Sequence, residues 1–337
     1  MKKYLFIAML FVLSLGVFFW LKVPNKTVVN KPGASPAPQA ADINSLTPLF
    51  PPPVTRGQMS YTITPPSSAF PSSLPLYTAG VQNQKAIVGG VAATLGFKTA
   101  PVAFSNAQGV HYVWNEEGAS LSVGGSPLEM NYSSGKNASG VVRATPEELG
   151  AAAQKHLSSL GLPQEPYKAA LASLAHFTLS GFDMRKTSLP AEATVVELSY
   201  QYNLENRPFF TGKLNEVGIK VRINSKKEVI SSVVVMPPPL LTTNETIAVA
   251  TIQEGVARLT RGEGVLVALF DEGSNEFSAP QYAASSATVK EIILGYYWGA
   301  GQEAVVPVYL FRGSAPDTET GALLTFATIV SALPINQ

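Results

Sequence analysis

Three histidines are the residues of this chain best suited to metal binding or to proton transfer near neutral pH. They are His111, His156 and His176, well separated in sequence, and the chain has no His-Glu-x-x-His segment and no histidine pair at ligand spacing. Isolated histidines without nearby ligand partners are more often structural than metal-binding. The sequence therefore predicts no metal site, and we expect a structural role for each histidine.

Hydroxyl nucleophiles and glycine-rich loops give no stronger signal. Residues 125–127 (Gly-Ser-Pro) lack the second glycine of a Gly-x-Ser-x-Gly nucleophile elbow and are typical of a turn. Residues 262–264 (Gly-Glu-Gly) lack the Gly-Lys-Ser/Thr ending of a phosphate-binding loop and are typical of the end of a helix. We therefore predict no catalytic residue and no nucleotide or other cofactor.

Carboxylates are scattered rather than paired for acid–base chemistry. The four aspartates all stand near turn signals: Asp42, Asp183, Asp271 and Asp317. The adjacent glutamates at 116–117 suit a hairpin turn, and those at 147–148 suit the first turn of a helix. Glycoside hydrolysis needs two carboxyl groups that face each other across a substrate, which a sequence cannot show. We favour a binding module that is not an enzyme; the alternative is a cell-envelope hydrolase with an unrecognised site.

Composition narrows the class of partner. The chain has 337 residues, a net charge of +1 and a charged fraction of 14%, with no sustained run of Lys and Arg. The basic footprint of a nucleic-acid-binding protein is therefore absent, and nucleic acid is not an expected partner. The chain has no cysteine, which excludes disulfides, thiolate metal sites and an anchor formed by a lipidated cysteine.

The N-terminus predicts a membrane anchor over residues 1–23. Residues 4–21 are uncharged and mostly apolar, and as a helix they would span about 27 Å, close to the thickness of the hydrocarbon core. The alternative is a cleaved signal peptide, but the segment ends in large residues (Val-Phe-Phe-Trp-Leu) rather than in a small-residue cleavage pattern. We expect a single-pass anchor in the lipid bilayer of the cell membrane, with the body outside the cytoplasm.

Residues 24–75 are expected to be a proline-rich linker, because they hold 12 of the 26 prolines and few large apolar residues. The folded body is then expected to begin near Leu76. Its pattern of helices followed by strands predicts three α+β units over 76–143, 144–239 and 240–337. The clearest helix start is Thr145-Pro146, where Thr145 and Glu148 can form a capping box.

Each of the three units is expected to contain one helix. Helices are expected over 84–97, 145–160 and 243–260, and residues 164–193 are expected to be a loop. Residues 294–297 and 306–311 are expected to be neighbouring antiparallel strands. The predicted fold class is α+β, with an N-terminal transmembrane helix and a proline-rich linker followed by repeated units of a helix packed on an antiparallel sheet.

Two short motifs of the third unit resemble a known family. Residues 294–298 (Leu-Gly-Tyr-Tyr-Trp) and 306–313 (Val-Pro-Val-Tyr-Leu-Phe-Arg-Gly) look like the C-terminal portion of YycH/YycI-type bacterial regulatory proteins and related PepSY-like envelope modules. Residues 198–203, 207–210 and 221–224 of the second unit are similar to the strand, turn, strand core of those families. The resemblance implies a membrane-anchored regulator that contacts a membrane or envelope protein, of the sensor-kinase or peptidase class, or a peptide. It implies no catalytic residues.

The aromatic residues of these motifs have an interpretation of their own. Tyr296, Trp298, Tyr309 and Phe311 alternate along two expected strands, so each pair would lie on one face of a sheet. Alternating aromatic residues in strands usually fill cores, and the competing interpretation is an aromatic recognition surface. We expect them to be core residues.

Overall fold

The computed structural model describes the greater part of the chain after residue 58. The described residues are 59–64, 69–80, 84–106, 109–161, 166–180, 183–211, 218–271, 282–299 and 301–334. The chain divides into two compact units, Met1–Ala40 and Ala41–Gln337, and all described residues belong to the second. The expected membrane anchor lies outside the described residues. No helix within the described ranges is long and apolar enough to cross a membrane.

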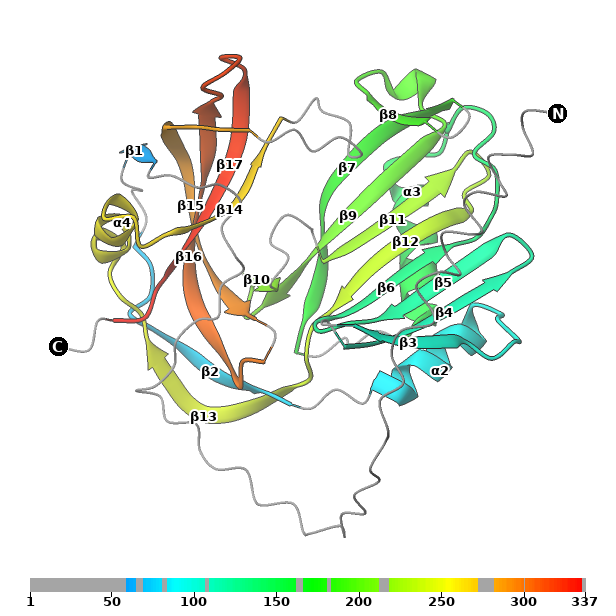
Figure 1. The fold of residues 1–337 in the computed structure, drawn as a ribbon, viewed down its shortest axis with the longest axis horizontal. Coiled ribbons are helices and arrows are strands. Elements are labelled where there is room, and N and C mark those ends of the chain that lie inside the picture. The colour runs from blue at the N-terminus through cyan, green and yellow to red at the C-terminus, as the bar shows by residue number, and fades with distance from the viewer. Residues whose placement is uncertain are drawn as a thin grey trace, which may run out of the picture. The chain divides into compact units, whose positions relative to one another are not determined.

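Hydrogen-bonded pairing connects the seventeen described strands into one mixed sheet (Figure 1). Its larger part is a run of nine antiparallel strands in the spatial order β3, β4, β5, β6, β12, β11, β9, β7, β8. These strands are β3 (Val102–Asn106), β4 (Gly109–Glu116), β5 (Ala119–Gly124), β6 (Leu128–Ser133), β7 (Lys168–Ser180), β8 (Asp183–Thr187), β9 (Val195–Leu204), β11 (Ile219–Asn224) and β12 (Val229–Met236).

The remaining strands are organised around β15. The antiparallel order is β14, β17, β16, β15, and both β1 and β10 pair with β15 in parallel. Strand β2 lies between β13 and the start of β16, antiparallel to both. These strands are β1 (Ser60–Ile63), β2 (Ser73–Ala79), β10 (Arg207–Thr211), β13 (Leu240–Ala248), β14 (Val265–Phe270), β15 (Ser286–Trp298), β16 (Ala304–Pro316) and β17 (Leu323–Ser331).

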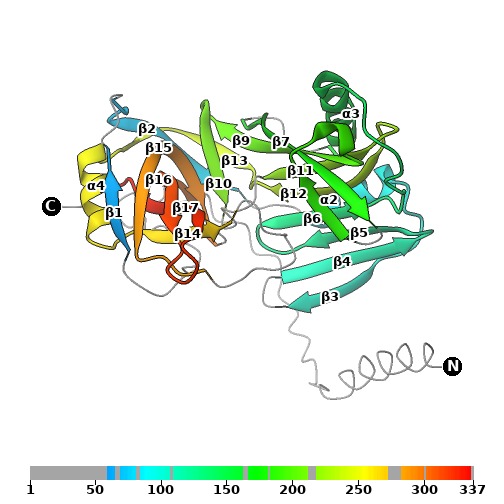
Figure 2. The same ribbon diagram turned by 90° about the horizontal axis from the view of Figure 1, so that it is seen from above.

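Three α-helices occur among the described residues: α2 (Gln84–Thr94), α3 (Pro146–Ser159) and α4 (Ile252–Thr260). Helix α2 packs on β5, α3 packs on β9, β11 and β12, and α4 packs on β1 and β17. The rings of Phe97, just after α2, and His156, on α3, both contact the ring of Tyr132 on β6. Helices α2 and α3 therefore cover the same face of the nine-strand run, as the view in Figure 2 also shows.

The aromatic residues of the third expected unit are core residues. Tyr296, Tyr309 and Phe311 are fully buried and Trp298 is nearly so, which confirms the core interpretation. Strands β15 and β16 pair antiparallel with Leu294 opposite Tyr309 and Tyr297 opposite Val306, which confirms the predicted strand pair. The opposite face of these strands is buried as well, in a separate apolar cluster that includes Tyr297 and Val308. A strand buried on both faces removes apolar side chains from water on both sides, which stabilises the fold.

The predicted repetition of helix-on-sheet units is wrong. Strand β6 of the expected first unit pairs with β12 of the second, and β2 pairs with β13 of the third. Helices α2 and α3 pack on one shared antiparallel run, so neither has a sheet of its own. The reason is that a strand pattern shows which face a strand buries but not which strand pairs with its edges.

Two elements within the body also differ from the sequence prediction. The helix expected over 243–260 is a strand, β13, up to Ala248, and α4 begins only after Thr251, whose hydroxyl caps the Glu254 amide. The β-branched residues of 242–247 favour the extended chain, and β2 supplies its hydrogen bonds. The segment 164–193, expected to be a loop, contains β7 and β8. Apolar and polar residues do not alternate strictly along it, so its pattern did not indicate strands.

The predicted linker does not extend to residue 75. Residues 60–63 form β1 along β15, and residues 73–79 form β2 along β13, with Met59 and Leu74 buried in the core. A fold can use a proline-containing segment in this way because an edge strand, or the first residues of a strand, tolerates missing amide donors. The rest of the expected linker, up to residue 58, lies outside the described residues.

Candidate functional site

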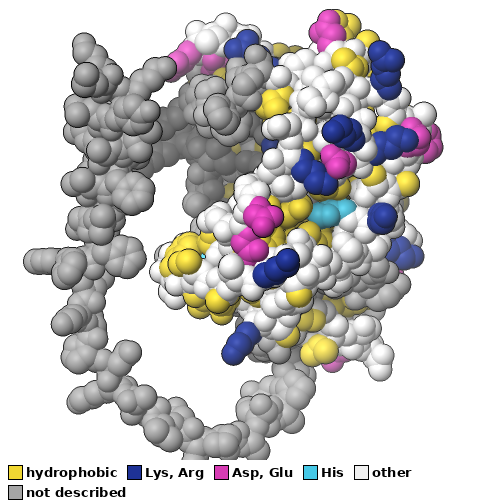
Figure 3. All heavy atoms as spheres, turned by 90° about the vertical axis from the view of Figure 1, so that its right-hand side faces the viewer, with side chains coloured by type: hydrophobic (Ala, Val, Ile, Leu, Met, Phe, Trp, Pro, Cys, Tyr) yellow, Lys and Arg dark blue, Asp and Glu magenta, His cyan; other side chains and the backbone are white. Residues whose placement is uncertain are grey.

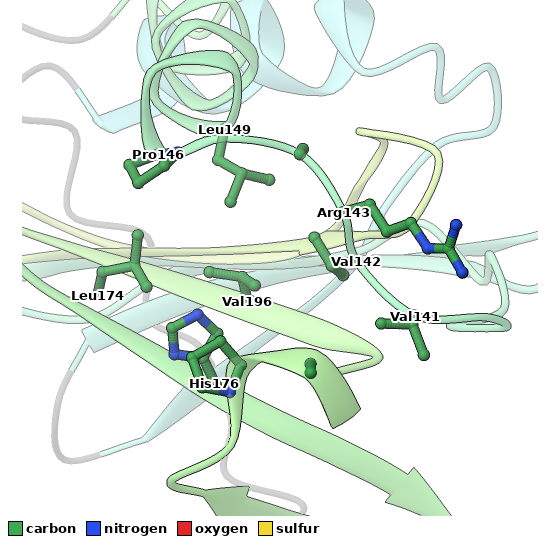
Figure 4. A pocket seen from close by; sticks show the side chains of 11 residues that line it. Val141, Val142, Arg143, Pro146, Leu149, Leu174, His176 and Val196 are labelled. Carbon is green, nitrogen blue, oxygen red and sulfur yellow. The ribbon is translucent and has the colours of Figure 1, made fainter.

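A pocket of about 620 Å³ lies where the chain enters α3 (Figure 4). We call it the strap pocket, because residues 140–145, the strap, form one of its walls. Helix α3 contributes Pro146 and Leu149, and the floor comes from β7 and β9. The side chains that line it are those of Val141, Val142, Arg143, Ala144, Pro146, Leu149, Leu174, His176, Pro190, Ala191 and Val196.

The strap is held in place by backbone geometry and one buried side chain. Gly140 has φ of +81°, a conformation that residues with a Cβ rarely adopt, and it starts the strap after the loop that follows β6. The Val142 amide donates to the carbonyl of Ala193 at 2.7 Å, and the Val142 side chain is buried. These contacts fix the strap beside the short helix η2 (Pro190–Glu192), which contributes Pro190 and Ala191 to the lining.

The capping box predicted from the sequence is present at the start of α3, directly after the strap. The Thr145 hydroxyl accepts from the Glu148 amide at 3.3 Å, and the Glu148 carboxylate accepts from the Thr145 amide at 3.0 Å. Lys227, on the β11–β12 turn, donates to the same carboxylate. The ammonium of Lys227 and then the Thr145 amide hold the pKa of Glu148 below its ordinary value. The helix end beside the pocket is therefore fixed from two directions.

The strap pocket is apolar and its ionisable groups are basic. Nine of its eleven lining residues are aliphatic or proline, and the other two are Arg143 and His176. In Figure 4 the side chains of Leu149, Leu174 and Val196 face the cavity, while the Arg143 side chain extends away from them. The lining therefore has an apolar interior and two basic side chains, and it contains no hydroxyl and no carboxylate.

The structure does not bring the three histidines together. His176 lines the strap pocket, and His156 bonds through Nε2 to the Ser232 hydroxyl at 2.9 Å while stacking on Tyr132. His111 stacks on Phe104 in β3, with ring centroids 5.2 Å apart, and bonds to Asn106. Among the described residues, no group of three or more His, Asp or Glu side chains is placed to hold a metal ion.

A partly buried ion pair lies on the other face of the nine-strand run. Arg222 Nε donates to Glu197 Oε2 at 2.7 Å between directly paired residues of β11 and β9, and the guanidinium lies 5.8 Å from the ring centre of Phe177. Their neighbours Val221 and Leu198 point to the helix-covered face, so Glu197 and Arg222 point away from it. A paired carboxylate and guanidinium of this kind satisfy each other, which indicates a structural role.

The two edges of the nine-strand run differ in character. Strand β3 is exposed over all five residues, carries no charge, and pairs only with β4 among the described strands. Val102 is 70% and Phe104 is 48% exposed, and alternation places both on one face. Strand β8, at the other edge, carries the exposed charges of Arg185 and Lys186. In the view of Figure 3, Lys and Arg are dispersed over the surface between small hydrophobic groups, without a single basic patch.

Sequence reasoning missed both surfaces. The strap residues Val141 and Val142 form an isolated apolar pair in a segment rich in Gly, Ser and Asn, a pattern that indicates burial of at least one of the two side chains. Strand β3 was also missed, although Val102 and Phe104 alternate with small residues.

Comparisons with known proteins do not identify a family. No protein-family model matches the chain, and no curated protein matches it. Among solved structures, the complex of MucA and MucB from Pseudomonas aeruginosa aligns over 75% of this chain and 95% of that chain, with 10% sequence identity and a TM-score of 0.10. A structure of MucB in complex with MucA(peri) aligns over 75% and 94%, with 11% identity and a TM-score of 0.09. Likeness at these scores carries no argument about fold or function, and the resemblance to YycH/YycI-type proteins stays a prediction.

Proposed function

We propose that this protein is a non-enzymatic binding module of the cell envelope, tethered by its N-terminal segment, that acts by contact with another envelope protein. The observation that carries the proposal is the uncharged edge strand β3, whose five residues are all exposed. The sequence resemblance supports a partner of the sensor-kinase or peptidase class.

An unprotected strand edge is unusual in a folded protein. Alternate residues of an edge strand direct their N–H and C=O groups outward, so the edge can pair with any extended chain. Proteins usually block such edges with charges, prolines or bulges, as Arg185 and Lys186 do on β8. Strand β3 has the sequence Val-Ala-Phe-Ser-Asn and carries none of these features within its bounds. This contrast favours β3 as the edge that receives a partner.

The side chains of β3 suit an extended polypeptide segment. Pairing along the edge would supply backbone hydrogen bonds, while Val102 and Phe104 would supply apolar contacts on one face. Phe104 is already ordered by stacking on His111, with an interplanar angle of 9°, so less side-chain entropy is lost when a partner covers it. The partner segment is therefore expected to be extended and to carry apolar residues at alternate positions.

The proposal is tested by site-specific photo-crosslinking in cells that express the full chain. A photoreactive residue replaces Ser105 on β3 or, as the matched control, Lys186 on β8; both positions are exposed. We expect one discrete adduct with an envelope protein from position 105 and none from position 186. Phe104→Lys, added to the chain that carries the photoreactive residue at position 105, should remove the adduct, because a charge at the edge opposes strand addition.

The proposal fails if positions 105 and 186 give the same adducts, or if the adduct from position 105 survives Phe104→Lys. Leu189→Lys is the control for the added charge, since Leu189 is 54% exposed and lies outside β3. This variant should leave the adduct intact.

A further inference from the structure

We infer that β3, when no partner covers it, pairs antiparallel with β3 of a second copy of this chain. The inference concerns the same edge as the proposed function and rests on it in one respect only, namely that an envelope partner and a second copy would compete for β3. All five residues of the strand are exposed, and β4 is its sole neighbour among the described strands. An edge of this kind is free to pair with another chain.

The register of such a pair follows from symmetry. Two identical edges related by a two-fold axis run antiparallel, and the same residues face each other from both sides. Overlap of the whole strand, Val102–Asn106, places the axis at its central residue, Phe104. Phe104 then lies opposite Phe104 of the second copy, and Ala103 lies opposite Ser105. Any other register forms fewer backbone hydrogen bonds.

The charge distribution along the edge favours a second copy. A strand that pairs with itself places its own charges opposite one another, and like charges directly opposite are destabilising. Residues 99–115 contain no Asp, Glu, Lys or Arg, so neither β3 nor its flanks repel a second copy. Strand β13, which pairs only with β2 among the described strands, carries Glu245, and β8 carries Arg185 and Lys186. Those two edges would repel their own copies.

The ring of Phe104 gives the pair a specific contact. Its inner side stacks on His111 of β4, the residue directly opposite it, with an interplanar angle of 9°. The other side of the ring therefore points past the edge of the sheet, and the residue is 48% exposed. Neighbouring strands lie about 4.8 Å apart, a spacing at which aromatic rings can stack with an offset. Phe104 of the second copy would continue the row of stacked rings across the two-fold axis.

The pairing should be weak and reversible. A five-residue edge buries much less surface than the roughly 800 Å² per partner of a stable complex. Copies tethered to one membrane, as the proposed function has it, would meet at a raised local concentration. A partner segment that makes additional contacts can therefore displace the second copy from the edge.

The test uses the absence of cysteine from the natural chain. Ala103→Cys and Ser105→Cys each place one thiol at an exposed position of β3, and one of the two full-length variants carries a tag so that unlike pairs differ in size. Both are purified in detergent and oxidised, separately and as a mixture. The mixture should give disulfide-linked pairs of unlike chains, because residues 103 and 105 lie directly opposite, with Cβ atoms about 5 Å apart. Each variant alone is the matched control and should give far less disulfide, since like thiols are then diagonal neighbours roughly 7–8 Å apart.

Charges at the two-fold axis provide a second test, which also shows that the variants are folded. Phe104→Lys in both thiol variants should abolish the disulfide, because two like charges then face each other. Phe104→Lys in one and Phe104→Glu in the other should restore it, since opposite charges directly across a strand pair attract. Leu189→Lys, at an exposed position outside β3, is the control for the added charge and should leave the disulfide unchanged.

The inference is overturned if the mixture gives no more disulfide than the separate variants, or if the combination of Lys and Glu does not restore it. Both measurements use the purified chain, so neither depends on an envelope partner. Photo-crosslinking in cells separates the two claims, because an adduct between two copies has twice the mass of the chain. Such adducts from position 105, without an adduct to another envelope protein, would overturn the proposed function and support the pairing of two copies.

Discussion

The imidazole of His156 has lost most of its contact with water. It lies between the ring of Tyr132 and the hydroxyl of Ser232, on the side of α3 that faces the sheet. Burial lowers the pKa of His156 below its ordinary value of 6.5, because the charged form is poorly solvated there. Neutral His156 is thus a packing residue with one hydrogen bond.

This pKa shift predicts a dependence of stability on pH. Below pH 6.5 the unfolded chain binds a proton at this residue more readily than the folded chain, so the free energy of unfolding falls as the pH decreases toward the lowered pKa. Urea unfolding between pH 7.5 and 5 should show this loss, and His156→Gln, which can keep a bond to Ser232, should lose less over the same range. An unchanged pH slope in His156→Gln would contradict the prediction.

Substitution by alanine is expected to have opposite effects on stability at two glycines, Gly313 and Gly89. A Cβ on Gly313 in β16 would lie 1.9 Å from the carbonyl oxygen of Thr288 in β15, a backbone atom that cannot move away. Gly313→Ala should therefore lower the free energy of unfolding by about 1–3 kcal/mol or more. A Cβ on Gly89 in α2 would meet no atom within 4 Å. Gly89→Ala should therefore raise the free energy of unfolding by up to about 1 kcal/mol, because alanine has the higher helix propensity. Chemical denaturation of both variants checks the pair, and similar effects at the two sites would contradict the argument.

At the scale of elements, local chemistry and tertiary pairing contribute differently to helices and strands. Helix α3 begins at the residue that its capping box predicts, because the box closes within four residues of chain. The sequence pattern of β13 indicates a helix. The segment is nevertheless a strand, because β2 supplies its hydrogen bonds from a distant part of the chain. Tyr309 in β16 shows a similar long-range dependence: its hydroxyl donates to the Ala250 carbonyl at 2.7 Å, and burial raises its pKa to about 12.

The capping box gives a prediction for α3. Thr145→Ala should lower the free energy of unfolding by about 1 kcal/mol, because the Glu148 amide loses its acceptor. Thr145→Ser retains the hydroxyl and should stay close to the wild type. Because the strap ends at Thr145, the alanine variant should also increase hydrogen exchange at the amides of the first turn of α3. Equal stability of the alanine and serine variants would show that the cap contributes nothing.

At the scale of the whole molecule, β1 and β2 tie the start of the described chain to its C-terminal half. Leu74 in β2 lies opposite Ile247 in β13, and Thr243 donates to the Leu76 carbonyl at 2.8 Å. Strand β1 supplies an edge to β15, and Tyr61 packs near Phe326 of β17. These contacts make residues 59–64 and 69–75 part of the fold.

A truncation experiment tests this dependence. A chain that begins at residue 41 should unfold cooperatively, whereas one that begins at Leu76 should melt at a lower temperature or be insoluble, since it lacks β1 and the first half of β2. Thermal unfolding followed by circular dichroism distinguishes the two. Identical melting temperatures would show that β1 and the start of β2 are dispensable.

The proposed function predicts a dependence on tethering rather than on a single catalytic group. Release of the body from its anchor should weaken its effect on a membrane partner, because the tether raises the local concentration of the body at the membrane. Alanine at His111, His156 or His176 should leave the effect in place if the protein stays folded. The two sets of variants are compared at equal abundance in cells. Full function of the released form, together with loss of function from one histidine change, would favour the envelope hydrolase instead.

The sequence by itself determined features that depend on neighbouring residues. It predicted the start of α3 from Thr145, Pro146 and Glu148, and the pairing of β15 with β16 from two strand patterns separated by a short turn region. It also predicted that the alternating aromatic residues are core. In each case the physical cause acts over a few residues, or between strands that follow each other in the chain.

Only the tertiary structure decided how distant strands pair, and with that the candidate sites. The pairing of β6 with β12 and of β2 with β13 joins segments about 100 or more residues apart, and it converts the expected units into one mixed sheet. The strap pocket needs α3, β7, β9 and η2 together, and the character of β3 as an open edge follows from the lack of a second partner among the described strands. Side-chain periodicity specifies the buried face of a strand, but the partner at each edge is chosen by packing of the whole molecule.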